Sequence, residues 1–133
     1  QNNTLYLLSP VELKISRQDY TTLSSKNIKL IEINNIKDIP GNADFWYWTR
    51  IQKERFADNE SYEKVKNKFI VTKDLVEKYA SAKTIIMHPL PRVGEIDPEV
   101  DSDPRAVYLR SQIRNGMYVR MALISLVLGK NES

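Results

Sequence analysis

The chain has 133 residues, 41% hydrophobic and 28% charged, which suits one compact domain with a sizeable core. It has no cysteine and one histidine, which excludes disulfides, thiolate metal sites and His-rich metal sites. The net charge of +3 comes from 20 basic and 17 acidic residues scattered along the chain, without the basic stripe of a nucleic-acid-binding protein. No apolar run is long enough to span a membrane. From these two observations, we expect neither nucleic acid nor a membrane as a partner.

Two short strands are predicted in the first third of the chain. Residues Thr4–Leu8, with the sequence TLYLL, have the pattern of a short buried strand. Residues 27–33, NIKLIEI, form a second predicted strand that is rich in β-branched side chains. Between them, Ser9, Pro10 and Glu12 have the spacing of a capped helix start, with proline at the first helical position. We therefore expect a helix directly after the first strand.

An aromatic strand follows in the middle of the chain. Residues 35–44 predict a short helical turn that is broken by a proline and a glycine. Residues 44–49, DFWYWT, then predict a strand that buries its tryptophans. Residues 50–69 are long and polar, which indicates a loop followed by a short helix.

The remaining elements complete an alternating pattern. Thr72 is placed to cap a helix that runs to about Tyr79, and residues 84–87, TIIM, form a fourth predicted strand. Asp103 and Pro104 then have the pattern of a capped start of a long helix. Strands that alternate with helices predict an α/β fold with a parallel sheet flanked by helices. In such sheets, ligands bind beyond the carboxyl ends of the strands, so the ends of the third and fourth strands are the expected site.

The last predicted helix is unusual for a surface helix. Residues 117–128, MYVRMALISLVL, are apolar nearly all round, and only Arg120 and Ser125 interrupt them. A surface helix normally shows one apolar stripe and one polar face. We therefore expect this helix to pack on a partner that the 133 residues do not contain.

A stiff corner follows the fourth predicted strand, in the sequence HPLPR. Each proline fixes its own φ angle and restricts the residue before it, so we expect Leu90 to be extended with its carbonyl directed outward. A cis bond between Leu90 and Pro91 is compatible with this corner. One interpretation is a rigid loop whose backbone meets a ligand, and the other is an ordinary turn. His88 alone indicates a hydrogen-bonded structural histidine more than a catalytic base.

A second polar cluster follows the third predicted strand, in the sequence TRIQKER. Arg50 and Gln52 are two residues apart at a strand end, so their side chains point the same way. A guanidinium in that position can bind a carboxylate through two parallel hydrogen bonds. Lys53, Glu54 and Arg55 form a mixed-charge cluster able to orient Arg50, although a solvated loop explains the same pattern.

The acidic stretch DPEVDSD places acids at alternate positions, as a calcium-binding loop does. Ser102 occupies the position where such a loop requires glycine, and Tyr108 the position where it requires a bidentate acid. A solvated acidic turn that caps a helix is therefore expected. The four glycines of the chain form neither a Walker loop nor a dinucleotide-binding fingerprint.

Three segments, in the same order and spacing, resemble the aspartate carbamoyltransferase family. They are WTRIQKERF, MHPLPRVGEID and VDSDPRAVYLRSQIRNGMYVRMALISLVLG. The resemblance is closest to the eukaryotic multifunctional type used in pyrimidine synthesis, and it is strong from Tyr47 onward. Ornithine carbamoyltransferases share the fold but typically have a cysteine at the position of Pro89. The RSQIRNG stretch is one residue longer than the family pattern, so the start of the last helix can be shifted relative to the family.

The resemblance implies an activity and a set of roles. The family joins carbamoyl phosphate to L-aspartate without a metal or organic cofactor. Arg50 and Gln52 would bind aspartate, while the Leu90 carbonyl, beside a cis bond to Pro91, would contact the amine and the carbamoyl group. A rigid corner suits this task because the reacting groups must be held in near-attack geometry. The residues implied to support the two loops are His88, Arg92, Glu54, Arg55 and Tyr62, and no catalytic residue is assigned.

The resemblance also implies that the chain is half of a two-domain fold. Residues 1–133 correspond to the aspartate-binding domain without its first strand–helix unit. The family's phosphate-binding Ser-Thr-Arg-Thr segment, its polarising histidine and a second aspartate-binding arginine are absent from the sequence. We therefore expect the chain alone to be inactive, its last helix to pack on the carbamoyl-phosphate domain, and the complete enzyme to be a cytoplasmic homotrimer. The alternative is a stand-alone, non-catalytic α/β module that binds carboxylates or acts as a scaffold.

Overall fold

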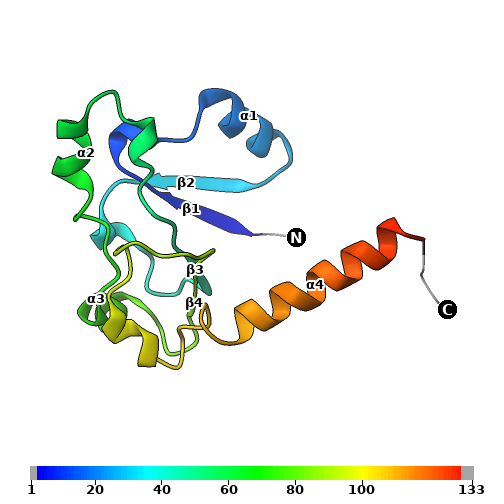
Figure 1. The fold of residues 1–133 in the computed structure, drawn as a ribbon. Helices are drawn as coiled ribbons and strands as arrows, with labels where there is room; N and C mark the ends of the chain where they lie inside the picture. The colour runs from blue at the N-terminus through cyan, green and yellow to red at the C-terminus, as the bar shows by residue number, and fades with distance from the viewer. Residues whose placement is uncertain (1–2, 130–133) are drawn as a thin grey trace.

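The computed structural model describes residues 3–129, which alternate short strands and helices as the sequence predicts (Figure 1). The strands are β1 (Thr4–Leu8), β2 (Lys29–Ile33), β3 (Phe45–Tyr47) and β4 (Ile85–Met87). The α-helices are α1 (Arg17–Ser25), α2 (Asn59–Val65), α3 (Lys73–Tyr79) and α4 (Ser111–Val127). Single 3-10 turns lie at Val11–Leu13, Ile36–Asp38, Lys53–Arg55 and Pro98–Ser102. Among the described residues, no helix has both the length and the apolar character needed to cross a bilayer.

The strands pair in parallel, as the alternation of strands and helices predicts, but they form two separate pairs. In the first pair, β1 lies beside β2, with Thr4 opposite Lys29. In the second pair, β3 lies beside β4, with Phe45 opposite Ile85. An isolated bridge between Ile86 and Ala106 adds a short extended segment to the outer edge of β4. The sheet is therefore divided between β1 and β3.

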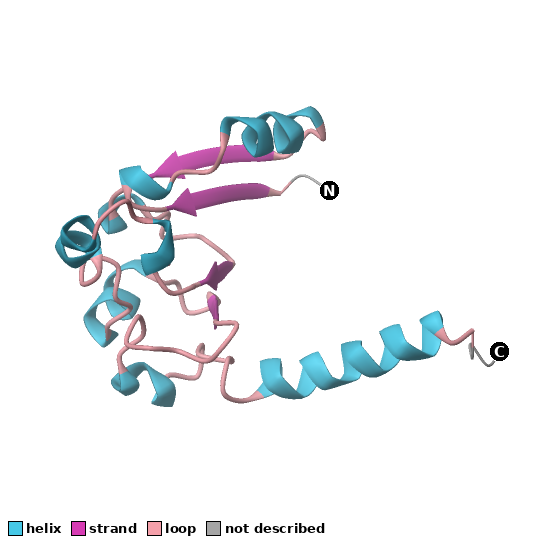
Figure 2. Cartoon of the chain, turned by 45° about the horizontal axis from the view of Figure 1, so that its top comes forward, coloured by secondary structure: helices cyan, strands magenta, loops and turns pink. Residues whose placement is uncertain are grey.

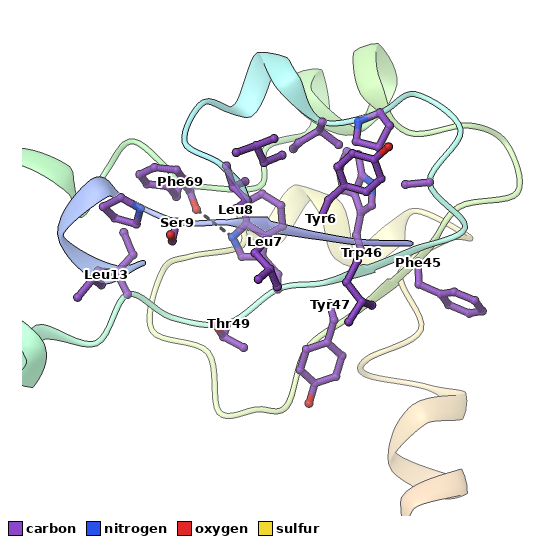
Figure 3. Close-up of a pocket in the computed structure, with 18 of the residues that line it drawn as sticks. Tyr6, Leu7, Leu8, Ser9, Leu13, Phe45, Trp46, Tyr47, Thr49 and Phe69 are labelled. Atoms are coloured by element: carbon purple, nitrogen blue, oxygen red, sulfur yellow. Dashed lines mark hydrogen bonds between the residues drawn. The ribbon is translucent and has the colours of Figure 1, made fainter. Parts of the chain in front are cut away.

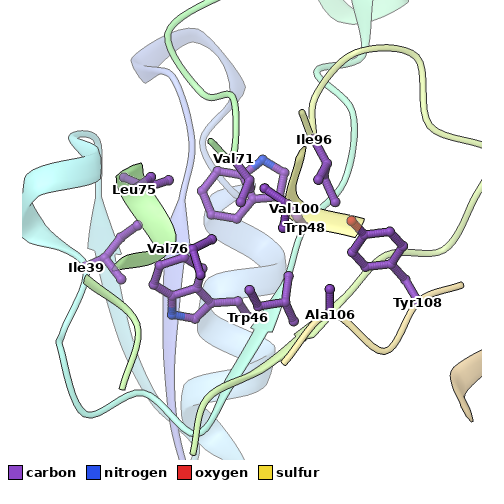
Figure 4. Close-up of a cluster of buried hydrophobic side chains, with 11 residues drawn as sticks. Ile39, Trp46, Trp48, Val71, Leu75, Val76, Ile96, Val100, Ala106 and Tyr108 are labelled. Carbon is purple, nitrogen blue, oxygen red and sulfur yellow. The ribbon is translucent and has the colours of Figure 1, made fainter. Parts of the chain in front are cut away.

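The hydrophobic core is centred on the second pair of strands (Figure 4). Trp46 and Trp48 are both buried, as predicted, and the indole N–H of Trp48 donates to the carbonyl of Phe69 at 2.9 Å. By contrast, β1 is exposed or half-buried along its whole length, so the prediction of a buried first strand is wrong. The physical reason is the division of the sheet, since β1 is an edge strand with no neighbour on the side away from β2.

Local capping patterns predict one helix correctly and misplace another. Thr72 caps α3 as expected, and its hydroxyl accepts from the backbone N–H of Leu75 at 3.2 Å. After β1, however, Pro10 is followed only by a 3-10 turn without a side-chain cap. The α-helix begins at Arg17, where the Ser16 hydroxyl accepts from the N–H of Asp19 at 3.0 Å. The capping signal at Ser9 therefore starts a single turn and not an α-helix.

The last helix also begins later than Asp103 and Pro104 predict. The Ile86 N–H donates to the Arg105 carbonyl at 2.8 Å, and the Val107 N–H donates to the Ile86 carbonyl at 3.0 Å. These ladder bonds hold the segment extended against β4, so α4 starts only at Ser111.

Helix α4 projects away from the rest of the chain in both ribbon views (Figures 1 and 2). Its apolar side chains are exposed throughout, so the described residues do not cover them. These side chains are Ile113, Met117, Tyr118, Val119, Met121, Leu123, Ile124, Leu126 and Val127.

Candidate functional site

Two loops leave the sheet side by side, at the carboxyl ends of β3 and β4. Residues 48–55 follow β3, and residues 88–97 follow β4. The parallel pairing continues past β3, because the Trp48 N–H donates to the Met87 carbonyl at 2.9 Å. The prediction that these two strand ends lie together is confirmed, and they occupy the edge where parallel α/β sheets bind ligands.

The HPLPR corner is a tight turn with unusual backbone geometry. The bond between Leu90 and Pro91 is cis, as the sequence indicates. Leu90 has a φ of 49°, in the left-handed region, so the prediction of an extended Leu90 is wrong. The cause is local, because the Leu90 N–H turns back to donate to Nδ1 of His88 at 2.9 Å.

His88 supports this corner from the buried side. Its side chain is 2% exposed, and Nε2 lies 2.8 Å from Oε1 of Glu95, which is itself 8% exposed. Nδ1 accepts the Leu90 N–H, which leaves Nε2 as the donor atom of the ring, and Nε2 contacts the Glu95 carboxylate without the geometry of a hydrogen bond. The other Glu95 oxygen accepts from the Val93 N–H at 2.8 Å. The expectation of a hydrogen-bonded structural histidine is confirmed.

Arg92 is fixed by a partner that lies nine residues further along the chain. Its two terminal nitrogens donate to the two carboxylate oxygens of Asp101, with 2.6 Å between Nη2 and Oδ2. The Tyr108 hydroxyl donates to Asp101 at 2.7 Å. The hydrogen bond from Arg92 holds the pKa of Asp101 below its ordinary value, and the same bond raises the pKa of Arg92. Burial, followed by the bond to Asp101, raises the pKa of Tyr108.

The acidic stretch is therefore only partly the solvated turn that the sequence predicts. Asp97 does cap a short helix, since its carboxylate accepts from the Glu99 N–H at 2.9 Å. Asp101 and Asp103 are instead partly buried, and each holds an arginine. Within residues 3–129, no group of acids and histidine is arranged to hold a metal ion.

The loop after β3 carries its charges closer to solvent. Arg50 forms two hydrogen bonds with Glu54, of 3.1 and 2.6 Å, and the two side chains are 47% and 55% exposed. The hydrogen bond and the charge of Glu54 raise the pKa of Arg50, and the charge of Glu95 in the neighbouring loop raises it further. Gln52 accepts from Arg55 at 3.4 Å. Glu54 thus orients Arg50 in the way that the mixed-charge cluster predicts.

Tyr62 lies behind this loop. Its ring packs edge-on against Phe56, with 5.8 Å between ring centroids, and the Lys53 ammonium lies 5.5 Å from the Tyr62 centroid. Tyr62 thus contacts both ends of the segment that carries Glu54 and Arg55.

A cavity of about 880 Å³ lies between β1 and β3 (Figure 3). It is lined by every residue of both strands, and also by Arg50, Gln52 and Arg55. The other predicted site residues do not line it. The two aspartate-contact candidates, Arg50 and Gln52, therefore line one cavity, and the HPLPR corner is not among the residues that line it.

The family description "Aspartate/ornithine carbamoyltransferase, Asp/Orn binding domain" matches residues 2–127. The chain belongs to this family. The fold agrees, because a solved catalytic subunit of M. jannaschii aspartate transcarbamoylase is 43% identical and superimposes with a TM-score of 0.86. That similarity covers 100% of this chain and 42% of the solved one.

Relatives of the carbamoyltransferase family come from both bacteria and eukaryotes. The multifunctional protein pyr1-3 of Dictyostelium discoideum is 50% identical over 122 residues, covering 92% of this chain and 5% of the relative. The aspartate carbamoyltransferase catalytic subunit of Clostridium kluyveri is 45% identical over 129 residues, covering 97% and 42%. The chain thus spans less than half the length of these relatives, and its identities to the two types are similar.

Several residues that shape this candidate site were not predicted from the sequence. Glu95, Asp101 and Tyr108 fix the HPLPR corner, yet each contacts a residue several positions away. One chemical signal could have indicated them. His88 and Arg92 lie in a stiff corner and both require hydrogen-bond partners, and acidic residues follow within the next ten positions. Gln112 bonds the backbone of His88 from α4, and no local pattern indicates that contact.

Proposed function

We propose that this chain forms the aspartate-binding half of an aspartate carbamoyltransferase. The reaction transfers the carbamoyl group of carbamoyl phosphate to L-aspartate, as a step of de novo pyrimidine biosynthesis. The observation that carries the proposal is one arrangement within a chain of this family. The Arg50 loop, with its oriented guanidinium, follows β3. The stiff corner at Leu90 follows β4, the parallel strand beside it.

The Arg50 loop supplies the contact with aspartate in this proposal. A guanidinium has five N–H donors, and Glu54 takes two of them, so donors remain for a substrate carboxylate. Gln52 lies two residues further along the same loop and offers an amide for the substrate. A cation suits the side-chain carboxylate of aspartate better than the ammonium of ornithine, which favours aspartate as the substrate.

The Leu90 corner positions the reacting groups. In the reaction, the aspartate amine forms a C–N bond to the carbamoyl carbon, the C–O bond to phosphate breaks, and one amine proton is released. The carbonyl of Leu90, beside Pro91, would accept a hydrogen bond from the amine or from the carbamoyl NH₂ group. The gain is one of positioning, because the chain offers this carbonyl on a backbone fixed by His88 and Arg92.

A solved relative was obtained with both proposed substrates. Aspartate transcarbamoylase from Trypanosoma cruzi, 29% identical over 91% of this chain, was solved with carbamoyl phosphate and aspartate together. Its TM-score of 0.75 supports the transfer of that substrate pair to this chain.

We further propose that a first strand–helix unit outside residues 1–133 completes the sheet. The order of strands, with β2 outside β1 and β3 facing β1 across the cavity, matches a doubly wound sheet in which the place of the first strand is open. A parallel strand there would pair with both open edges and cover the exposed side chains of Leu5 and Tyr6.

A carbamoyl-phosphate domain is the second missing part. The exposed apolar surface of α4 is the natural place for it to pack, since apolar area of this size favours association. The phosphate-binding groups would stabilise most of the developing charge, so we propose that residues 1–133 alone are inactive. A homotrimeric enzyme and a cytoplasmic location belong to the same proposal and rest on the family resemblance.

Joining the missing parts tests the proposal. The chain is expressed alone and, in parallel, fused behind the carbamoyl-phosphate domain and first strand–helix unit of a bacterial relative, and carbamoyl aspartate is measured. We expect product only from the fused protein. A fused protein that binds aspartate without turnover would support the alternative of a non-catalytic carboxylate-binding module. Turnover by the chain alone would contradict the division of the site between two domains.

A further inference from the structure

The first turn of α4 is joined to the HPLPR corner by one side chain. Oε1 of Gln112 accepts from the backbone N–H of His88 at 3.2 Å. Nε2 of the same amide donates to the His88 carbonyl at 2.7 Å. Both backbone groups of His88 are therefore held by a residue 24 positions away, and the function proposed above assigns no role to Gln112.

This contact continues the hydrogen-bond ladder along the outer edge of β4. The N–H and carbonyl of Ile86 bond residues 105 and 107, and the next groups on that edge belong to His88, two residues further on. The Val107 carbonyl does not continue the ladder, because it accepts the N–H groups of Arg110 and Gln112 instead. The Gln112 side chain thus supplies the donor and acceptor that the backbone no longer offers.

The contact leads directly to the proposed substrate group. Gln112 fixes the His88 backbone, and Nδ1 of the His88 ring accepts the Leu90 N–H at 2.9 Å. Two hydrogen-bonded steps therefore separate α4 from Leu90. Beyond this first turn, the apolar side chains of α4 are exposed, so a partner that packs on α4 would act on the corner through Gln112.

We propose that Gln112 is a positioning residue for carbamoyl transfer, which couples the seating of α4 to the placement of the Leu90 carbonyl. The proposal rests on the function proposed above. Only a side chain with a donor and an acceptor at this reach satisfies both groups of His88.

The first experiment needs no enzyme activity. Gln112→Glu keeps the shape and the acceptor but places a carboxylate oxygen against the His88 carbonyl. Amide hydrogen exchange in the full chain should accelerate about tenfold at His88 and Leu90, while the urea midpoint stays close to that of the parent. Gln18→Glu, the same change at an exposed position of α1, is the control and should alter neither amide.

Gln112→Met provides a second variant that removes both bonds without adding charge, and it should accelerate the same two amides. Exchange at Leu90 within about twofold of the parent in both variants would overturn the proposal. Global unfolding of both variants would also overturn it, because Gln112 would then be a structural residue.

The second experiment measures kinetics in the fused protein described above. Gln112→Glu should lower kcat about tenfold and change KM for either substrate less than about threefold, because the Leu90 carbonyl acts on the reacting groups. A change in KM alone would overturn the proposal. If the unmodified fused protein makes no carbamoyl aspartate, the proposed function fails, while the exchange experiment still decides the structural coupling.

Discussion

The two loops that end β3 and β4 are built by opposite means. The loop after β4 holds a buried histidine, a bidentate arginine–aspartate pair and a cis proline bond. The loop after β3 carries its arginine on one ion pair that is about half exposed. The difference teaches that the two proposed substrate contacts are held in different ways. The backbone group proposed to meet the reacting atoms is fixed by buried bonds, whereas the proposed carboxylate contact stays open to solvent.

The largest effect on stability is expected from His88→Ala. The change removes the acceptor of the Leu90 N–H and leaves the Glu95 carboxylate buried without its partner. The free energy of unfolding should fall by about 3 kcal/mol or more. Urea denaturation followed by circular dichroism measures it, and Val93→Ala, at an exposed position of the same loop, is the control. A loss below about 1 kcal/mol would mean that the corner is not held by this histidine.

A smaller loss is expected from Asp101→Asn. The amide keeps one oxygen but turns an N–H donor toward the Arg92 guanidinium, so the bidentate pair cannot form. Because both side chains are partly exposed, we expect a loss of about 1–2 kcal/mol in the free energy of unfolding. The control Glu99→Gln makes the same acid-to-amide change at an exposed position of the same turn. Equal urea midpoints for the two variants would count against the role of Asp101.

Acid should weaken the same region in a predictable window. The pKa of Asp101 is lowered, chiefly by its bond to Arg92, so the folded state binds this proton less readily than the unfolded chain does. Its contribution to stability is therefore present above the ordinary value of 3.8 and is lost as the pH falls through the lower, folded pKa. Urea midpoints from about pH 6 downward should decrease more steeply for the parent than for Asp101→Asn. Parallel curves would show that Asp101 does not contribute to the acid sensitivity.

The smallest effect on stability is expected from Arg50→Ala, which sharpens the comparison between the loops. An exposed ion pair contributes little to folding, so the urea midpoint should not change measurably. In the fused protein, however, kcat/KM for aspartate should fall about tenfold to a hundredfold, with far less change for carbamoyl phosphate. Lys should restore activity only in part, because it lacks the planar fork.

Arg17→Ala, at an exposed position of α1, is the control for this prediction and should leave both measurements unchanged. If Arg50→Ala keeps kcat/KM for aspartate within about twofold of the parent, Arg50 is a surface loop residue and the assignment is wrong.

The sequence was sufficient to predict features that depend on neighbouring residues. The approximate positions of the strands, the Thr72 cap of α3 and the pairing of β3 with β4 follow from local periodicity and from the alternation of elements. The same local logic fails where a distant segment competes. Asp103 and Pro104 have a helix-start pattern, but β4 takes residues 105–107 into its ladder and delays α4.

The site shows the same limit. Arg50 and Glu54 are four residues apart, and the sequence predicted that they interact. The bonds of Asp101 to Arg92 and of Gln112 to His88 join segments whose proximity only the fold determines. The left-handed Leu90 likewise depends on a bond to a histidine ring, which overrides the preference for an extended residue before proline.

The placement of the two tryptophans has a consequence for spectroscopy. Trp46 and Trp48, the only tryptophans in the sequence, lie with their ring centroids 6.1 Å apart in the core beside β3. Intrinsic fluorescence excited at the indole band therefore reports on this half of the molecule. The signal does not report on events confined to β2 or to the C-terminal end of α4. A fluorescence label on either of those elements would be needed to follow them.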